Sequence, residues 1–484
     1  MAVGSSNDFD LVVIGAGTGG YAAAFRGAQL GLRVALVDEG KIGGTCLHRG
    51  CIPTKAMLES AAVHHRVAHA RDYGIVVAGE VTVDYGAIAK RRDQVVNRMW
   101  KGLGSLVKKN NVEWIAGRAR LEGGTKVRVQ LAGEDGTPGA GGERLLSATD
   151  VVLATGSRVK SLPGIVPDGR RIVTSDDLLR SDPATATLPR SVIVIGAGAV
   201  GLEFASLYFD LGASVTVLEY LPAIAPLEDR EVSRELERSY TRRGIKVVTN
   251  ARFDAASVVA GEHDVRLTVG PEGGEATEIS AEMLLVAAGR ATNTEDVGLE
   301  TTAAVVDRGI VKVDGHMRTA EPHLYAIGDI VGGLQLAHTA AHEGIIAVHT
   351  MTGDADVHAM DYVKQPKATY CRPEIASVGL TEQGCEAKGL DVKIAKIPFQ
   401  AIGKAIIGGE YEGFTKIISD KVTDEILGIH IIGPHATDLI AEGSLALQLE
   451  ATAWELGATT HAHPTLSEII GETAMAVSGQ AINF

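Results

Sequence analysis

The sequence predicts an α/β protein in which two Rossmann-like domains are combined with a C-terminal α+β domain. Two observations predict it. A strand, a glycine-rich turn, a helix and a second strand ending in an acid occur near the N-terminus and again near the middle of the chain. From about residue 361 the pattern changes to alternating apolar segments, which are typical of antiparallel strands. A chain of 484 residues is long enough for several such domains.

The first copy of the repeat has every feature of a dinucleotide-binding unit. It consists of residues 10–14 as a strand, Gly15, Gly17 and Gly20 as the turn, residues 21–30 as a helix, and residues 32–37 as a strand that ends at Asp38. The glycines allow a tight turn and let backbone N–H groups approach a pyrophosphate at the helix N-terminus. The acid can bind a ribose hydroxyl. Glycines at this spacing between a strand and a helix, with an acid at this distance, are a specific signal.

The second copy repeats the first at the same spacing. It consists of residues 191–195 as a strand, Gly196, Gly198 and Gly201 as the turn, a helix to Leu211, and residues 213–218 as a strand that ends at Glu219. First glycine and acid are 23 residues apart in both copies. The chain either binds two dinucleotides or binds one and carries a degenerate repeat. Because neither copy has lost a glycine or its acid, the sequence favours two dinucleotides.

The residues after the second acid favour one form of nicotinamide cofactor. A carboxylate at Glu219 accepts a hydrogen bond from a free 2′-hydroxyl and repels a 2′-phosphate. Residues 220–224 contain neither Arg nor Lys. We therefore expect NAD rather than NADP.

Cys46 and Cys51 form the most reactive candidate pair in the chain. A disulfide across so short a loop stabilises a fold only slightly, and intracellular disulfides are more often catalytic than structural. Pro53 suits the first turn of a helix, and residues 54–70 read as helical, so Cys51 should lie just before a helix N-terminus that favours a thiolate. The pattern predicts one thiolate of low pKa and a second cysteine that exchanges with an incoming disulfide or dithiol. The alternative is a pair of buried structural thiols.

The remaining candidates lie at strand ends and near the C-terminus. The strands at residues 151–156 and 284–290 end in small residues, and residues 324–329 end at Asp329, which either accepts from a sugar alcohol or caps the next helix. His463 precedes a proline, and Glu468 could hold its imidazole as a general base requires. The alternative for His463 is an ordinary surface histidine.

Composition limits the function classes. Hydrophobic residues make up 45% of the chain and charged residues 22%, as in ordinary globular proteins. The formal net charge of −14 argues against nucleic acid as a partner. No apolar stretch reaches the roughly 18 residues of a membrane span, and residues 1–10 lack the pattern of a secretory signal. We expect a cytoplasmic enzyme that binds neither nucleic acid nor membrane.

Taken together, these features resemble the flavin-dependent pyridine nucleotide–disulfide oxidoreductases, and within that family the enzymes that oxidise dihydrolipoamide. The resemblance extends from Asp8 to about Glu472 and rests on the motifs at residues 43–55, 154–156, 325–329 and 463–468. It implies FAD and NAD as cofactors. It also implies that protein-bound dihydrolipoamide is oxidised to lipoamide, with reduction of NAD to NADH, through a Cys46–Cys51 disulfide and FAD.

The resemblance also implies the role of each site residue. Cys46, Cys51, His463 and Glu468 would be catalytic, with His463 and Glu468 serving the disulfide of the partner subunit in a homodimer. The residues expected along the FAD are Gly15, Gly17, Gly20, Asp38, Thr45, Ala119, Thr155, Gly156, Asp329 and Ala337. Lys55 would lie near the flavin, paired with Glu203. The residues expected to hold NAD are Gly196, Gly198, Gly201, Glu219 and Gly289. No metal ligand is implied.

The implied domains are an FAD-binding domain, an NAD-binding domain and a dimer-interface domain. The FAD-binding domain would take residues 1–158 and 289–360, the NAD-binding domain residues 159–288, and the interface domain residues 361–484. The expected partner is the lipoyl-bearing acyltransferase subunit of a 2-oxoacid dehydrogenase complex, or the lipoyl protein of glycine cleavage.

The sequence departs from the commonest family pattern between the cysteines, where His48-Arg49 replaces Asn-Val. We hypothesise that the added positive charge lowers a cysteine pKa or shifts the disulfide potential; the alternative is a polar surface substitution. Other family members fit less well. Mercuric reductases and large thioredoxin reductases need a C-terminal thiol pair, but this chain ends Ile482-Asn483-Phe484. Glutathione reductases prefer NADP. The complete catalytic set argues against a non-catalytic flavoprotein subunit.

Overall fold

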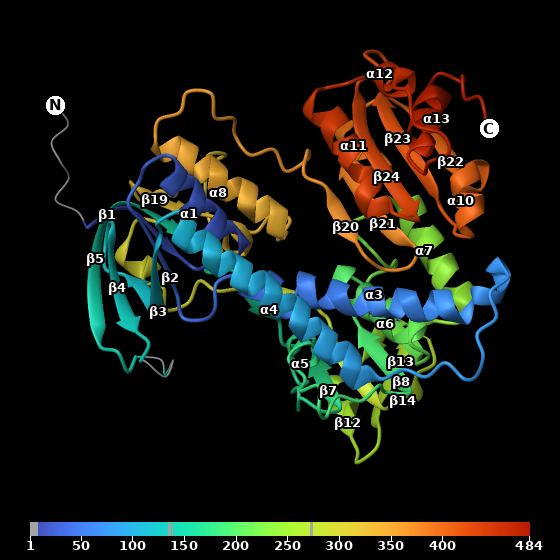
Figure 1. Ribbon diagram of the computed structural model, residues 1–484, viewed down its shortest axis with the longest axis horizontal. Helices are drawn as coiled ribbons and strands as arrows, with labels where there is room; N and C mark the ends of the chain where they lie inside the picture. Colours follow the sequence, from blue (N-terminus) through green and yellow to red (C-terminus); the bar gives the residue numbers. More distant parts are fainter. Residues whose placement is uncertain (1–7, 134–136, 138, 272–273) are drawn as a thin grey trace. The chain divides into compact units, whose positions relative to one another are not determined.

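The computed structural model describes residues 8–133, 137, 139–271 and 274–484 (Figure 1). Residues 1–10 were considered as a possible secretory signal, and residues 1–7 of that segment lie outside the described residues. The chain forms two compact units. The first contains the residues up to Pro53 together with Lys90–Lys160 and Arg290–Tyr362, and the second contains Thr54–Ala89, Ser161–Gly289 and Val363–Phe484. Residues 54–89 thus belong to the second unit, whereas the sequence predicts that they form part of a domain with residues 1–158. The assignment of FAD, NAD and interface domains stays a prediction.

The first unit is built on a parallel sheet in the order β3-β2-β1-β5-β19. Its strands are β1 (Phe9–Ile14), β2 (Val34–Asp38), β3 (Glu113–Leu121), β5 (Glu143–Leu153) and β19 (Leu324–Ala326). Leu11, Val12 and Val13 are completely buried, as expected for a parallel strand that is covered on both faces. The strand β4 (Lys126–Leu131) joins β3 and β5 in an antiparallel extension.

Helices and short strands complete the first unit. Helices α1 (Thr18–Gln29) and α8 (Ala337–Met351) pack on each other, and α2 (Gly44–Arg49) follows β2. The short elements are β6 (Ser157–Val159), β16 (Arg290–Thr292), β17 (Val306–Asp307), β18 (Ile310–Val311), η3 (Leu299–Thr301) and η4 (Gly328–Val331). Helices α3 (Cys51–Ala68) and α4 (Tyr85–Lys109) contain the boundaries between the units at Pro53/Thr54 and Ala89/Lys90.

The second unit contains the second copy of the repeat as a parallel sheet in the order β10-β9-β8-β15-β7. Its strands are β7 (Ile172–Thr174), β8 (Ser191–Ile195), β9 (Ser214–Leu218), β10 (Lys246–Val248) and β15 (Met283–Val286). Its helices are η1 (Ala70–Tyr73), α5 (Ser175–Leu179), α6 (Ala199–Asp210) and α7 (Arg230–Arg243). Beside it lie η2 (Ala255–Ser257) and the antiparallel strands β11 (Ala251–Phe253), β12 (Val259–Ala260), β13 (Val265–Pro271) and β14 (Thr277–Ala281).

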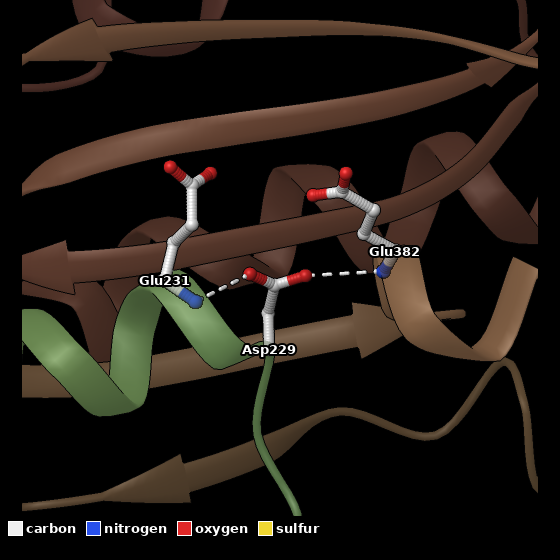
Figure 2. Close-up of side chains that lie close together, drawn as sticks. All are labelled: Asp229, Glu231 and Glu382. Carbon is white, nitrogen blue, oxygen red and sulfur yellow. Dashed lines mark hydrogen bonds between the residues drawn. The ribbon is translucent and has the colours of Figure 1, made fainter. Parts of the chain in front are cut away.

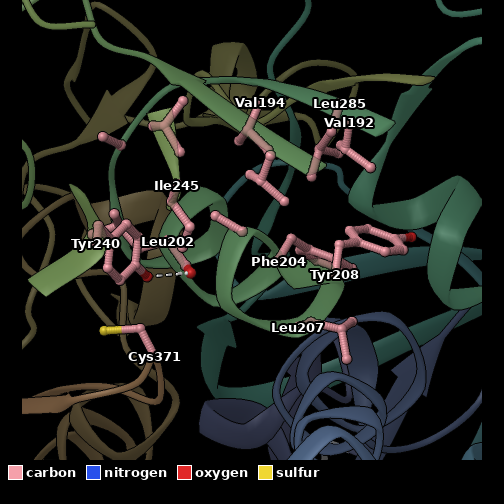
Figure 3. Close-up of a cluster of buried hydrophobic side chains, with 14 of the residues drawn as sticks. Val192, Val194, Leu202, Phe204, Leu207, Tyr208, Tyr240, Ile245, Leu285 and Cys371 are labelled. Carbon is pink, nitrogen blue, oxygen red and sulfur yellow. Dashed lines mark hydrogen bonds between the residues drawn. The ribbon is translucent and has the colours of Figure 1, made fainter. Parts of the chain in front are cut away.

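A large apolar core holds the helices of this repeat against its sheet. Figure 3 shows part of it, where α6 contributes Leu202, Phe204 and Tyr208 against strand residues such as Val194. The Tyr240 hydroxyl donates a hydrogen bond of 2.8 Å to the Leu202 carbonyl, so a buried polar group is satisfied. Helix α6 is therefore rigidly supported behind its glycine-rich N-terminus.

The C-terminal part of the second unit is an antiparallel sheet in the order β20-β21-β24-β23-β22. Its strands are β20 (Lys367–Thr369), β21 (Glu374–Gly379), β22 (Val392–Pro398), β23 (Phe414–Asp420) and β24 (Ile426–Gly433). The associated helices are α9 (Glu382–Lys388), η5 (Phe399–Ala401), α10 (Gly403–Gly408), α11 (Ala436–Gln448), α12 (Ala453–Ala458) and α13 (Glu468–Val477). The predicted α/β class with a different C-terminal architecture is confirmed.

Element boundaries agree closely with the sequence beside the second glycine turn. The strand there has the predicted limits of 191–195, whereas β2 begins two residues later than expected, at Val34. Among the described residues, no helix combines the length and apolar character needed to cross a membrane.

Candidate active site and nucleotide-binding sites

The two cysteines lie on consecutive helices of the chain. Cys46 is in α2, Cys51 is the first residue of α3, and both are half-buried free thiols. The helix therefore begins at Cys51 itself, not just after it as expected. Gly50 separates the helices at close quarters, because a Cβ there would lie 3.0 Å from the Thr45 carbonyl oxygen and 3.2 Å from the Cys46 Cα. Only a residue without a side chain fits this join comfortably.

The two thiols interact directly. A hydrogen bond with Cys51 is the main cause that raises the pKa of Cys46, and burial adds to it. Because a thiolate on Cys51 would accept from the Cys46 thiol and repel a second negative charge, ionisation of Cys51 opposes ionisation of Cys46. Placed at the start of α3, Cys51 is the sulfur whose thiolate the helix dipole favours. This arrangement can carry out thiol–disulfide exchange.

His48 does not add charge to the cysteine pair near neutral pH. Burial, together with the nearby Lys41 and Arg49, lowers the pKa of His48 below its ordinary value. Of the two residues in the charge hypothesis, only Arg49 therefore brings a positive charge. The lowered pKa argues against a charge on His48, and the effect of the two residues on the cysteine pair stays a prediction.

Lys55 and Glu203 form the ion pair that the resemblance implied. Lys55 Nζ lies 2.8 and 2.7 Å from the two carboxylate oxygens of Glu203, which is buried in α6. The Tyr370 N–H donates to Glu203 Oε1 over 3.0 Å, and the Lys55 ammonium lies 4.6 Å from the centre of the Tyr370 ring. Sequence reasoning missed Tyr370, and no local motif marks it, because it reaches the pair only through the tertiary fold.

The first glycine turn has the form of a phosphate cradle. Gly15 has a φ of +101°, and a Cβ on Gly20 would lie 1.8 Å from the Gly15 carbonyl oxygen. At Gly17, in contrast, an added Cβ would meet nothing within 4 Å. The turn thus leaves open space in front of the N-terminus of α1, which is where a pyrophosphate binds in this kind of fold.

Asp38 holds this turn in place. Its carboxylate accepts hydrogen bonds from the N–H groups of Ala16, over 2.6 Å, and Gly40, over 2.7 Å. The sequence predicted a contact with a ribose hydroxyl and did not predict these backbone bonds. A carboxylate has about four acceptor positions, so the ribose contact stays a prediction.

The second turn has the same construction. Gly196 has a φ of +102°, a Cβ on Gly201 would lie 1.9 Å from the Gly196 carbonyl oxygen, and Gly198 faces open space. Glu219 accepts from the N–H groups of Ala197, over 2.6 Å, and Leu221, over 2.8 Å. Both copies have therefore kept the cradle and the acid that supports it, and the residues fit a dinucleotide in each.

Arg252 is a cation that contacts Tyr220, the residue after Glu219, and the local sequence did not reveal it. The Arg252 guanidinium stacks 3.8 Å from the centre of the Tyr220 ring and donates to the Tyr220 carbonyl over 2.8 Å. The preference for NAD was argued from the absence of Arg and Lys in residues 220–224. Arg252 arrives from β11, beyond the reach of that argument.

Asp329 is a hydrogen-bond acceptor and not a helix cap. It accepts from the Ser157 hydroxyl, while the residue that caps η4 is Ile327 and makes no side-chain bond. The capping alternative is therefore wrong. Thr155 donates to the Asn293 carbonyl over 2.6 Å, and Gly156, with a φ of +69°, leaves open space where a side chain would be.

The positions of the other predicted cofactor residues do not by themselves indicate a ligand. Ala119 lies in β3, and its side chain is buried in an apolar cluster, so only its backbone could face a ligand. Thr45 is half-buried in α2, and Ala337 is the first residue of α8. Gly289 has a φ of +105° with no atom near its would-be Cβ. Their roles stay predictions.

His463 and Glu468 form a hydrogen-bonded pair in the second unit. The His463 Nδ1 lies 2.8 Å from Glu468 Oε1, and the Thr465 N–H donates to Glu468 Oε2 over 2.8 Å. Burial acts to raise the pKa of Glu468, but these hydrogen bonds outweigh it and lower the pKa. With Nδ1–H donating to the carboxylate, Nε2 is the ring nitrogen that can accept a proton. The imidazole side chain is 80% exposed, so substrate can reach it.

An acidic cluster elsewhere in the second unit contains its own cation. Figure 2 shows Asp229 accepting from the N–H groups of Glu231 and Glu382, each over 3.0 Å. The Lys416 ammonium lies 3.0 Å from Asp229, 3.0 Å from Glu231 and 2.5 Å from Glu382. The position that a metal ion could take among these carboxylates is therefore filled by a buried lysine.

Comparison with known proteins identifies the family. The family model described as pyridine nucleotide-disulphide oxidoreductase matches residues 9–344, and the model for the dimerisation domain of the same family matches residues 365–474. The chain belongs to the pyridine nucleotide-disulphide oxidoreductase family. The predicted family membership is thus confirmed over most of the chain.

Among members of this family, the chain is similar over its full length to dihydrolipoyl dehydrogenases. It is 45% identical to that of Bacillus subtilis, with 99% of this chain and 100% of the relative covered. It is 40% identical to that of Rhizobium etli, with 99% and 100% covered. Among solved structures, LpdA from Mycobacterium tuberculosis superimposes with a TM-score of 0.87 at 29% identity, covering 96% of this chain and 99% of LpdA.

Proposed function

We propose that the chain oxidises the dihydrolipoyl group to the lipoyl group and reduces NAD to NADH. Its cofactors are FAD and NAD, and its full-length relatives are dihydrolipoyl dehydrogenases. The observation that carries the proposal is the placement of Cys46 in α2 and Cys51 at the first residue of α3, across the tight join at Gly50, because two neighbouring thiols can exchange with a dithiol.

In the proposed mechanism, His463 removes a proton from one thiol of the substrate while Glu468 holds the imidazole in place. The resulting thiolate attacks Cys46 in the oxidised pair, the Cys46–Cys51 bond breaks, and Cys51 leaves as a thiolate at the helix N-terminus. The second substrate thiol then attacks the substrate sulfur of the mixed disulfide, the bond from that sulfur to Cys46 breaks, and Cys46 leaves with the proton of the second thiol. Lipoyl disulfide is released, and the two electrons stay on the cysteine pair.

The bound FAD supplies the two-electron chemistry that connects the cysteine pair with NAD. The first glycine turn, with Gly17 facing open space, fits the FAD pyrophosphate, and the second turn, with Gly198 likewise open, fits NAD. The Lys55–Glu203 pair keeps a positive charge on α3, one helical turn beyond Cys51. The contribution of this chain is to orient these groups and to stabilise the thiolate.

The proposed assembly is a homodimer in which His463 and Glu468 of one copy serve the cysteine pair of the other. The dimerisation domain at residues 365–474 contains both residues and supports this arrangement. The proposed partner is a lipoyl-bearing protein: the acyltransferase of a 2-oxoacid dehydrogenase complex or the lipoyl protein of glycine cleavage.

A Cys46→Ser variant tests the thiol chemistry. We expect the purified protein to form NADH from NAD and free dihydrolipoamide, and the variant to lose more than 99% of this turnover, on the order expected when a nucleophile is removed. Its flavin absorbance and its FAD content should match those of the unchanged protein. Full turnover by the variant would show that the thiols have been assigned wrongly.

A further inference from the structure

The helix that carries Cys46 is too short to be stable alone. Helix α2 has 6 residues, and its N-cap is Gly43, which has no side chain that could cap the helix. Helices of this length do not persist in water without tertiary contacts. Whatever fixes the Cys46 sulfur relative to Cys51 must therefore come from packing around α2.

His48 makes two contacts of this kind. Its Nε2–H donates to the Ile42 carbonyl over 2.9 Å, so the ring ties α2 to the segment that precedes it. Its ring also meets the Trp100 ring of α4 edge-on, with the centroids 6.4 Å apart and the planes inclined by 71°. Lys41 lies over the same Trp100 ring, 4.6 Å from its centre. The segment before α2 and α2 itself are thus both packed on one aromatic side chain.

From these contacts we infer that His48 is a positioning residue, which holds α2 so that Cys46 stays within bonding distance of Cys51. The inference rests on the proposed redox role of the cysteine pair. His48 acts through its geometry and not through charge, because burial lowers its pKa and the ring is neutral near pH 7. Holding two thiols close raises their effective concentration, and therefore favours the disulfide over the dithiol.

The test is the exchange equilibrium of the holoenzyme with dithiothreitol. The cysteine pair gives up two electrons and two protons when its disulfide forms, and oxidised dithiothreitol takes them up as it becomes the dithiol. Alkylation of the free thiols after equilibration measures the oxidised fraction. We expect His48→Val to lower the equilibrium constant for disulfide formation about fivefold, the effect of one neutral hydrogen bond. His48→Gln keeps an N–H donor and should restore the constant to within about twofold.

His64→Val is the matched control. Like His48, His64 is a half-buried histidine bonded to a backbone carbonyl, with Nδ1 at 2.6 Å from the Asp210 oxygen, but it lies far along α3 from the cysteines. It should leave the equilibrium unchanged even if it lowers the melting temperature. Should His48→Val fail to fold, Trp100→Leu removes the same ring contact and should shift the equilibrium in the same direction.

The outcomes separate the inference from the function on which it rests. If Cys46 and Cys51 in the unchanged protein do not cycle between dithiol and disulfide, the proposed function fails. If they cycle and His48→Val has the wild-type constant, or if His64→Val shifts it equally, only the positioning role of His48 fails.

Discussion

Glu343 has a raised pKa that no local sequence motif predicts. This glutamate in α8 is 2% exposed and accepts from the Gly328 N–H, over 2.6 Å, and from the Tyr362 hydroxyl, over 2.8 Å. Burial, with a smaller contribution from Asp329, raises its pKa from 4.5 to about 7. Between these two values the folded chain holds a proton that the unfolded chain has released, so stability falls as the pH rises through this window.

Replacing Glu343 by Gln should therefore change how stability depends on pH. The variant lacks the titration, so its free energy of unfolding relative to the unchanged protein should increase between pH 4.5 and 7, by on the order of 3 kcal/mol. Urea unfolding of both holoproteins at pH 5 and pH 8 measures this. Glu80→Gln, at an exposed site, should give the same difference at both pH values. An equal difference for Glu343→Gln would contradict the shifted pKa.

At the scale of elements, Lys416 in β23 connects two helix N-termini to the C-terminal sheet. Asp229 caps α7 through the Glu231 N–H, and Glu382 is in the first turn of α9. Burial acts to lower the pKa of Lys416, but the three surrounding carboxylates outweigh it and raise the pKa. The lysine therefore stays charged, although its side chain is completely buried.

Lys416→Met should be strongly destabilising, because it leaves the buried Asp229 carboxylate without its counter-charge. Breaking a buried ion pair in this way costs about 3–5 kcal/mol. Lys396→Met is the matched control: Lys396 also contacts Glu231, over 2.5 Å, but its side chain is 42% exposed, and such pairs contribute about 1 kcal/mol or less. Denaturant unfolding distinguishes the two. If both variants lose a similar free energy of unfolding, burial of Lys416 among the three carboxylates does not contribute the stability that is expected.

The elements were predictable to different degrees for a physical reason. The strand at 191–195 is a short apolar run that leads directly into a glycine turn, and the spacing of glycines and acids marks both turns. In contrast, the bonds of Asp38 and Glu219 to the turns, the packing of Tyr370 on Lys55 and the stacking of Arg252 on Tyr220 join segments far apart in sequence. Contacts of that kind arise only when the sheets assemble, so neither periodicity nor a motif reveals them.

At the scale of the whole molecule, the proposed dimer predicts complementation between two inactive variants. Cys46→Ser lacks a working cysteine pair, and His463→Gln lacks the base. In a mixed dimer, one site combines the intact cysteines of one copy with the intact histidine of the other. Random mixing should make about half of the dimers mixed, each with one working site of two, so about one quarter of the full activity should return.

The measurement is NADH formation after the two variants are unfolded and refolded together with FAD. Refolding each variant alone is the control and should give no recovery. If the mixture stays inactive while the unchanged protein recovers under the same conditions, His463 does not serve the cysteine pair of a second copy.

The hydrogen bonds that Asp38 and Glu219 accept from backbone N–H groups affect how the protein binds its dinucleotides. Asp38 and Glu219 fasten their glycine turns with hydrogen bonds that involve protein atoms alone. Because these bonds need no ligand atom, the entropy of ordering the turns is lost mainly during folding. After removal of its flavin, the chain should keep the conformation of both glycine turns. FAD should therefore bind to a preorganised site, and its binding should not be coupled to folding of the turn.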